Sequence, residues 1–229
     1  MTRLLAIESS SETCSAALHD GADTRERHEH APMRHAELLL PSVQALLAVA
    51  DIGLAELDAI AFGRGPGSFT SLRIGIGVVQ GLAWGAEVPV IPVSSLAAVA
   101  LEASELSGGD QTLVRVALDA RMQQVYHCDF RAQGPDSIIA LSRERVCDPG
   151  ELSDTPDEPF IVAGNGFERF EELEQQAGNA VHSFPQLLPR ASMIVRLALD
   201  WLRDNEPLPA ALAQPVYIRN EVAVKPSRD

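Results

Sequence analysis

The chain is poor in cysteine and in positive charge. Only three cysteines occur in 229 residues, and Cys14, Cys128 and Cys147 are far apart in the sequence. This spacing argues against a disulfide framework and against the paired thiols of a zinc or redox site. Lys and Arg total 18 against 32 Asp and Glu, which gives a formal net charge of −14. Such a charge opposes the counterion release on which nucleic-acid binding depends, so we expect no tight binding of nucleic acid by this chain alone.

Long apolar runs are also missing. The apolar run 4–7 near the amino terminus is broken at Glu8, which makes it too short for a signal sequence or a membrane span. A chain of this length can bury a substantial core without disulfides. We therefore expect a protein of the reducing cytoplasm.

The first part of the chain alternates short strands with helices. Strands are predicted at 4–7, 14–19, 24–28, 58–62 and 90–93 from apolar or alternating runs between turn signals. Helices are predicted at 35–50 and 71–86, and a third runs from the N-cap residue Ser94 to about 105. Pro41 should kink the first of these helices or mark its true start.

The segment 107–110, Ser-Gly-Gly-Asp, is the clearest break in the pattern. We place a lobe boundary there, with residues 1–107 in a first lobe and residues 108–229 in a smaller second lobe. The second lobe is predicted to contain strands at 113–118, 125–130, 138–141 and 160–163 and helices at 167–176 and 191–205. Pro207, Pro209 and Pro215 end the last helix and leave an extended tail at 217–221.

A glycine-rich loop at 63–70 joins a predicted strand to a predicted helix. Backbone amides and the helix dipole at this place can receive an anion, although the lysine and spacing of a Walker loop are absent. An ordinary tight turn with Thr70 or Ser71 as N-cap explains the loop equally well, and the serines that end the first strand leave the same two interpretations open. The candidate phosphate or nucleotide residues are Glu8, Ser9, Ser10, Gly65, Gly67, Ser68 and Thr70.

The helix after this loop has glycines four residues apart, at Gly77, Gly81 and Gly85. Each costs about 1 kcal/mol relative to alanine, so the stripe indicates that another helix packs closely along it. A dinucleotide-binding interpretation fails, because no strand directly precedes these glycines and their interval is too long.

The densest set of candidate metal ligands is His28, His30 and His35. The first two alternate on a predicted strand and the third lies beyond a proline, so their convergence on one ion requires a favourable turn. A solvated strand end is the simpler interpretation.

Several motifs, in the same order and spacing, resemble the TsaB family. They are LAIESS at 5–10, RHAELLLP at 34–41, GPGSFTSLRIG at 65–75, PVSSL at 92–96, DARM at 119–122, GNG at 164–166 and YIRNEV at 217–222. Small departures are Glu8 where aspartate is usual, Ser71 where glycine is common, and Gln123 and Gln124 after DARM. The resemblance extends over nearly the whole chain.

This resemblance implies an α/β fold of the actin-like, Hsp70-like ATPase class (ASKHA, RNase H-like), with two lobes and a reduced second lobe. It also implies a non-catalytic partner of the paralogue TsaD and of the small ATPase TsaE, which together transfer threonylcarbamoyl to adenosine 37 of tRNA. The chain would meet tRNA only through the complex and would need no cofactor. A homodimer of the isolated chain stays an alternative.

The resemblance further implies that catalytic residues and a catalytic metal are absent. TsaD has a His-x-x-x-His metal pair, and the corresponding positions here are Ser95 and Val99. The competing hypothesis is a metal-dependent peptidase or a sugar-kinase-like enzyme of the same fold. A kinase of this class needs acidic residues at two phosphate loops. Glu8 is present in the first, but Asp119 in the second is followed by Arg121 rather than by a glycine-hydroxyl pair.

The association surface is predicted on the helices 35–50 and 71–86. The glycine stripe permits close approach of a neighbouring helix, and we expect leucines of the first helix to offer uncovered apolar area. The predicted interface residues are His35, Leu38, Leu39, Leu46, Arg73, Gly77, Gly81 and Gly85.

Overall fold

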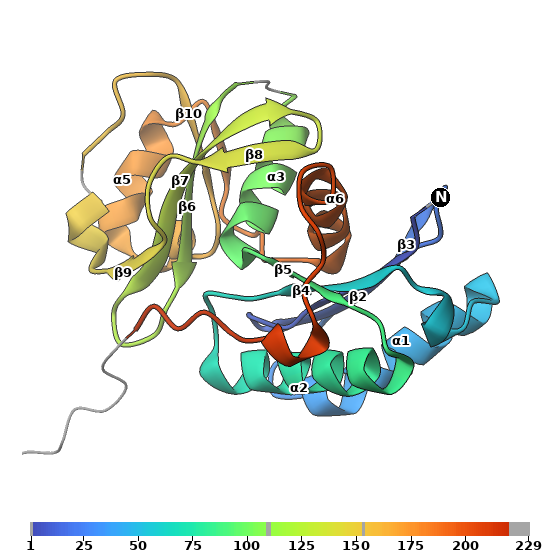
Figure 1. The fold of residues 1–229 in the computed structure, drawn as a ribbon. Helices are drawn as coiled ribbons and strands as arrows, with labels where there is room; N and C mark the ends of the chain where they lie inside the picture. Colours follow the sequence, from blue (N-terminus) through green and yellow to red (C-terminus); the bar gives the residue numbers. More distant parts are fainter. Residues whose placement is uncertain (1, 109–110, 153, 220–229) are drawn as a thin grey trace, which may run out of the picture.

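The computed structural model describes residues 2–108, 111–152 and 154–219, and it contains two mixed β-sheets with helices packed on their faces (Figure 1). This is the two-lobed α/β arrangement that the sequence predicts. No helix among the described residues is long and apolar enough to cross a bilayer.

The first sheet has the strand order β3-β2-β1-β4-β5. Strand β1 runs antiparallel to β2 and parallel to β4, and β5 is parallel to β4. Alternate residues of β1 face opposite sides, so that Leu5 and Ile7 join one apolar cluster while Leu4 and Ala6 join another. The strands are β1 (Leu4–Glu8), β2 (Thr13–His19), β3 (Thr24–His30), β4 (Ala59–Gly63) and β5 (Val90–Val93).

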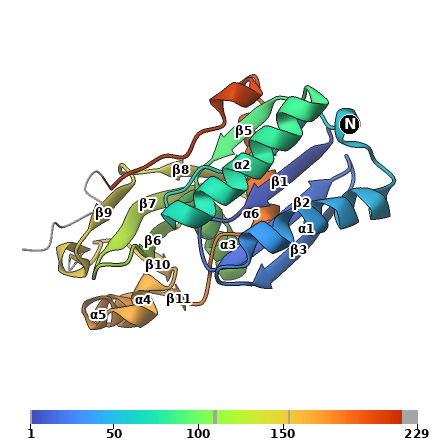
Figure 2. The same cartoon turned by 90° about the horizontal axis from the view of Figure 1, so that it is seen from below.

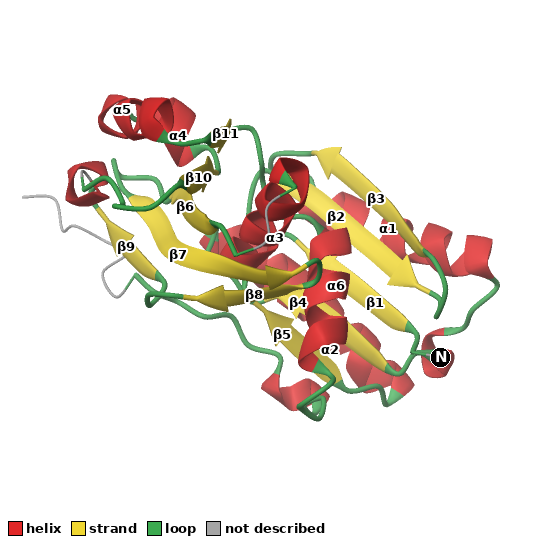
Figure 3. Cartoon of the chain, turned by 90° about the horizontal axis from the view of Figure 1, so that it is seen from above, coloured by secondary structure: helices red, strands yellow, loops and turns green. Residues whose placement is uncertain are grey.

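Helices cover both faces of this sheet. Helices α1 (His35–Ala50) and α2 (Phe69–Ala86) lie side by side on one face (Figure 2). Helices α3 (Ser95–Ser107) and α6 (Ala191–Trp201) lie on the opposite face (Figure 3). A short 3-10 turn, η1 (Leu54–Glu56), leads into β4.

The observed first residues of α1, α2 and α3 can be compared with the predicted helix starts and N-caps. Helix α1 has the predicted bounds and continues through Pro41, so a start at this proline is wrong. Helix α2 begins at Phe69 with Ser68 as N-cap, which corrects the choice of Thr70 or Ser71. The N-cap of α3 is confirmed, because Ser94 Oγ accepts a hydrogen bond from the backbone N–H of Ala97 at 3.1 Å.

The second sheet has the order β11-β10-β6-β7-β8, and β9 also pairs with β7. The three-residue strands β9 and β11 were not predicted from the sequence. The helix predicted at 167–176 is two helices, because Phe170 between them has extended backbone angles. The remaining elements are β6 (Leu113–Asp119), β7 (Val125–Gly134), β8 (Ser137–Ala140), β9 (Arg145–Cys147), η2 (Pro149–Leu152), β10 (Phe160–Ala163), α4 (Gly166–Arg169), α5 (Glu171–Asn179), β11 (His182–Phe184) and η3 (Ala210–Leu212).

The last helix does not pack where the sequence places it. The sequence assigns α6 to the second lobe, but Ile194 and Ala198 belong to the apolar cluster of β1, β4 and β5 in the first sheet. The chain therefore returns to the first sheet before its tail. The lobe boundary after Ser107 stays a prediction, and Gly109 and Asp110 lie outside the described residues, as does the predicted tail beyond Arg219.

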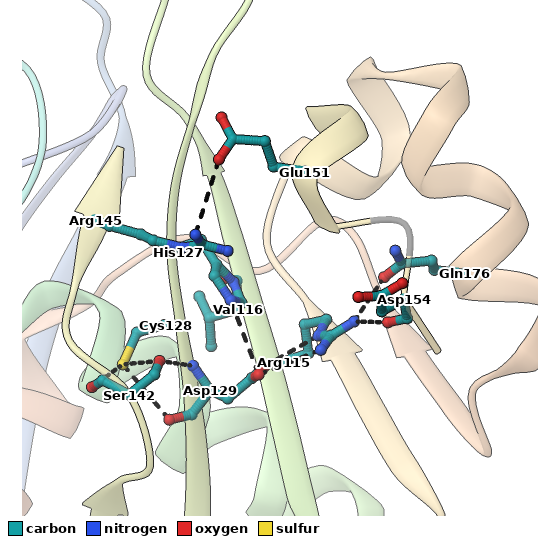
Figure 4. A network of polar contacts seen from close by, with 10 residues as sticks. All are labelled: Arg115, Val116, His127, Cys128, Asp129, Ser142, Arg145, Glu151, Asp154 and Gln176. Carbon is teal, nitrogen blue, oxygen red and sulfur yellow. Dashed lines mark hydrogen bonds and ion pairs between the residues drawn. The ribbon is translucent and has the colours of Figure 1, made fainter. Parts of the chain in front are cut away.

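A buried polar network joins strands β6 and β7 of the second sheet to helix α5 (Figure 4). Arg115 of β6 makes two hydrogen bonds to the carboxylate of Asp129 on β7, at 3.0 and 3.2 Å. Arg115 Nη1 also donates to the backbone oxygen of Asp154 and to Gln176 Oε1. His127 Nε2 lies 3.9 Å from the same Asp129 carboxylate, and burial lowers the pKa of this histidine.

Replacing Asp129 by alanine should lower the free energy of unfolding by about 3 kcal/mol, because Arg115 keeps a buried, uncompensated charge. The matched control is Glu158→Ala. Glu158 pairs with Arg131, which lies on β7 like Asp129, but this ion pair is more exposed than the Arg115–Asp129 pair. Its loss should lower the free energy of unfolding by less than about 1 kcal/mol. Urea unfolding of both variants measures the difference. Equal destabilisation of the two variants would contradict the structural role of the Arg115–Asp129 pair.

Candidate functional site

A cleft of about 630 Å³ lies where the two sheets meet. Ligands of open α/β sheets bind outside the carboxyl ends of the strands, and the segments that follow β1, β6 and β10 all contribute to this cleft. The first turn of α2 and the tail also line it. The polar lining residues include Ser10, Ser11, Glu12, His35, Ser68, Thr70, Ser71, Arg73, Asp119, Arg121, Tyr126, Asn165, Tyr217 and Arg219.

The structure separates the predicted phosphate residues into two sets. Ser10, Gly67, Ser68 and Thr70 line the cleft, whereas Glu8, Ser9 and Gly65 do not. The side chain of Ser9 turns away to α2, where its hydroxyl donates to the backbone oxygen of Ser71 at 3.0 Å. The loop as a phosphate site stays a prediction.

Gly67 is needed for contact between the two loops. The backbone N–H of Ser68 donates to the backbone oxygen of Ser10 at 2.7 Å, and a Cβ at Gly67 would overlap that same oxygen. Only glycine lets the two backbones approach this closely. The loop after β4 is thereby fixed against the loop after β1.

Glu8 is a fully buried carboxyl group. Its oxygens accept hydrogen bonds from the backbone N–H of Ser10 at 2.5 Å and from Ser95 Oγ at 2.7 Å. A Cβ at Gly63 would overlap the carboxylate, so the neighbouring strand is shaped around it. Burial raises the pKa of Glu8, and the hydrogen bonds from Ser10, Ser95 and the backbone of Ser9 only partly oppose that shift.

The two positions that the family resemblance assigns to the TsaD metal pair, Ser95 and Val99, are both buried. Ser95 is the hydrogen-bond donor to Glu8, and Val99 packs in the apolar cluster between α3 and the second sheet. Within residues 2–108, 111–152 and 154–219, no group of three or more His, Cys, Asp or Glu side chains could hold a metal ion. The histidines 28, 30 and 35 accordingly do not converge, and His35 is buried with Nε2 bonded to the backbone oxygen of Thr13 at 3.0 Å. The absence of a bound metal stays a prediction.

The turn between β6 and β7 has an unusual backbone. Arg121, Met122 and Gln123 all have positive φ, near +60°, although none is glycine. Asp119 Oδ1 accepts the N–H of Arg121, and the guanidinium of Arg219 donates to the backbone oxygen of Arg121 and to Gln124. Strained turns of this kind persist only where neighbouring groups hold them, and they are common at functional sites.

The tail contributes residues that the sequence does not assign to the cleft. Tyr217 packs on Phe69 with ring centroids 5.2 Å apart, and its hydroxyl accepts a hydrogen bond from Arg73 Nε at 2.9 Å. The Arg73 guanidinium lies over the Phe69 ring, 3.8 Å from the centroid. The sequence predicts that this tail is extended, but it carries no signal that the tail folds back onto α2.

The outer face of α1 and α2 carries the predicted interface glycines. Gly77, Gly81 and Gly85 are exposed, and a Cβ on any of them would meet no atom within 4 Å. The glycine stripe is therefore not used for packing within the described chain. Large apolar side chains are exposed on the same two helices, with Trp84 72% and Val49 75% exposed.

The prediction that leucines of α1 offer uncovered apolar area on this face is partly wrong. Leu39 and Leu46 are buried in the core between α1 and the sheet, and His35 is buried as well. Helical spacing identifies a face but not whether it points inward, and these residues belong to the inward face of α1. Leu38 is half-buried and Arg73 is exposed. The interface as such stays a prediction.

The raised pKa of Glu8 predicts a pH-dependent effect of Glu8→Gln. The folded state holds the Glu8 proton more tightly than the unfolded state does, so wild-type stability falls as pH rises above about 4.3 until pH passes the folded pKa. The glutamine variant lacks this loss. Its free energy of unfolding relative to wild type should therefore increase from pH 4 towards pH 7 in urea titrations. A difference that stays constant over this pH range would show that Glu8 is not desolvated.

Comparison with known proteins identifies the relatives of this chain. The sequence model of the family described as TsaD, tRNA N6-adenosine threonylcarbamoyltransferase, matches residues 28–223. The tRNA threonylcarbamoyladenosine biosynthesis protein TsaB of Escherichia coli (strain K12) is 34% identical over 226 residues, which covers 97% of each chain.

Two solved structures from Pseudomonas aeruginosa have the same fold at 39% identity. YeaZ superimposes with a TM-score of 0.86 over 95% of this chain and 100% of that chain. A protein described as uncharacterized, with similarity to peptidase YEAZ, superimposes with a TM-score of 0.87 over 96% of this chain and all of the other. The predicted fold class is confirmed, and the chain belongs to the TsaB family of tRNA threonylcarbamoyladenosine biosynthesis proteins.

Proposed function

We propose that this chain is a non-catalytic partner subunit of TsaD, acting with the ATPase TsaE in threonylcarbamoyl transfer to adenosine 37 of tRNA. The observation that carries the proposal is the uncovered outer face of α2. Its glycine stripe leaves open space along an 18-residue helix, beside the largely exposed Trp84. Small residues flanked by an exposed aromatic side chain suit close docking of a helix from a partner.

The chemistry of the buried residues supports a role without catalysis. Val99 has no metal-binding atom, and the Ser95 hydroxyl is occupied by Glu8. Glu8 itself is enclosed and does not line the cleft, so it is not placed to act on a substrate there. A metal-dependent peptidase or a sugar kinase finds no favouring side-chain arrangement among the described residues.

The charge of the chain supports contact with tRNA only through its partner. A net charge of −14 repels phosphate, so the partner subunit would supply the basic surface. The same apolar face would pair with a second copy when TsaD is absent. A cytoplasmic location follows from this role, because tRNA is modified there.

Reconstitution tests the proposal directly. TsaD and TsaE from the same organism, with tRNA, ATP and a threonylcarbamoyl donor, should form the modified nucleoside only when this chain is added. Mass spectrometry of the digested tRNA measures the product. Equal product without this chain, or product from this chain alone with tRNA and the donor, would refute the proposed role.

Substitution of Gly81 by arginine tests the interface. The new side chain points into open space and replaces an exposed helical glycine, so the melting temperature should stay equal or rise slightly, because glycine costs about 1 kcal/mol in a helix. Binding to TsaD should nevertheless fall at least about tenfold, since the arginine prevents close approach.

The matched control is Gly178→Arg. Gly178 is also exposed, lies in helix α5 and has open space around its Cβ position, but it belongs to the other lobe. Its TsaD affinity, measured by calorimetry, should equal that of wild type. Retained TsaD binding by a folded Gly81→Arg variant would place the interface elsewhere.

A further inference from the structure

Unpartnered polar atoms gather at the cleft. Several buried side-chain nitrogen and oxygen atoms of the described residues have no hydrogen-bond partner. Two of them, His35 Nδ1 and Arg219 Nε, belong to residues that line this single cleft. Buried polar groups are normally satisfied, so orphaned atoms grouped around one cavity indicate a missing polar partner.

The hydrogen bond of His35 fixes what that partner must offer. Its Nε2 lies 3.0 Å from the backbone oxygen of Thr13, and a carbonyl oxygen can only accept. Nε2 therefore carries the proton, and in the neutral ring Nδ1 is left as an acceptor. A group that satisfies Nδ1 must donate, as a hydroxyl or an amino group does, and the hydroxyl of Ser10 can either donate or accept.

Positive charge at the cleft is only partly neutralised. Arg121 is paired with Glu12 at 2.7 Å and with Asp119 at 3.5 Å. Arg73 and Arg219, in contrast, have no carboxylate within ion-pair distance in the described part of the chain, and their partners there are neutral. Two arginines without an acidic partner, in a chain of net charge −14, favour an anionic ligand.

The start of α2 adds to the same preference. Its first turn, Phe69–Ser71, lines the cleft, and the side chain of the N-cap residue Ser68 accepts no backbone hydrogen bond. The N–H groups of a first helical turn have no partner within the helix and attract anions. Arg73 lies one turn further along and is held in place by Phe69 and Tyr217.

We infer that the cleft binds a small organic anion, a phosphate or a carboxylate, that also carries a hydroxyl or amino hydrogen-bond donor. The oxyanion lies between the first turn of α2 and Arg73, and the donor group faces His35 Nδ1. Ser10 and Arg219 complete the polar contacts. The site adjoins the outer face of α2, because Arg73 lies four residues before Gly77 on the same side of the helix. Its test uses the isolated chain and does not require TsaD.

Calorimetry on the isolated full chain tests the site with four probes. Glycerol 3-phosphate combines a phosphate with hydroxyl donors, glycerate combines a carboxylate with the same donors, and propyl phosphate and propionate have the oxyanion alone. At least one hydroxylated anion should bind, and the tighter of the two identifies the oxyanion. Propyl phosphate should bind about tenfold more weakly than glycerol 3-phosphate, because His35 Nδ1 stays unsatisfied.

Substitutions locate the binding. Arg73→Gln should weaken the preferred hydroxylated anion at least about tenfold, while Arg27→Gln, an equal change of charge at an exposed position on β3, should leave its affinity unchanged. Both arginines are exposed, so melting temperatures should match wild type.

The proposal is overturned by any of three results. These are no binding of either hydroxylated anion at millimolar concentration, equal affinity for the preferred hydroxylated anion and its analogue without hydroxyl groups (propyl phosphate for glycerol 3-phosphate, propionate for glycerate), or equal weakening by Arg73→Gln and Arg27→Gln. None of them involves TsaD, so failure here is distinguishable from failure of the proposed role in tRNA modification.

Discussion

The burial of α3 between the two sheets is the constraint on which the rest of the structure depends. Residues 95–104 of this helix are all buried, which is expected only of a helix enclosed on every side. Ala98 and Leu101 pack with the first sheet and α6, while Leu96, Val99 and Ala103 pack with the second sheet. One helix thus contributes side chains to both cores. The same burial explains why position 99 is an apolar residue.

Polar contacts at the N-terminus of α6 connect this helix to α3 and to β3. Arg190, just before the helix, forms ion pairs with Glu26 of β3 and Glu102 of α3. Glu26 also accepts the backbone N–H of Ser192 at 2.8 Å, at the helix end where negative charge is favourable. A strand at the edge of the first sheet, the central helix and the last helix are therefore tied at a single place, although they are far apart in sequence. Without Arg190, the largely buried carboxylates of Glu26 and Glu102 would lose their cationic partner, which is costly.

Sequence patterns predict the elements of this chain better than their contacts. The bounds of α1 and the N-cap of α3 follow from local signals, namely apolar spacing and the preference of serine for the cap. Strands β9 and β11 have three residues each, too few to show a period, so no pattern could reveal them. The break at Phe170 is equally hidden, since an apolar residue fits a continuous helix as well as a link between two helices.

The sequence predicts only those residues of the candidate site that belong to a recognisable local motif. The loops after β1 and β4 were identified from serines and glycines, and four of their residues do line the cleft. Arg219 and Tyr217 reach it because the tail crosses α2, which depends on contacts such as Val216 N–H to the Arg64 backbone oxygen at 2.8 Å. Long-range contacts of this kind have no sequence period. The inward direction of Leu39 was missed for a related reason, because two apolar faces of one helix look alike until the sheet beneath is known.

Helix α2 tolerates its exposed glycines because the opposite, buried face of the helix supplies its packing against the first sheet. The inward residues Leu72, Ile76, Val79 and Ala83 are buried at helical spacing against the first sheet. Each large buried side chain contributes about 2 kcal/mol, whereas each exposed glycine costs about 1 kcal/mol of helix propensity. The buried face therefore outweighs the stripe and holds the helix in place. Because the stripe makes no packing contact within the described chain, its glycines are available for the docking proposed above.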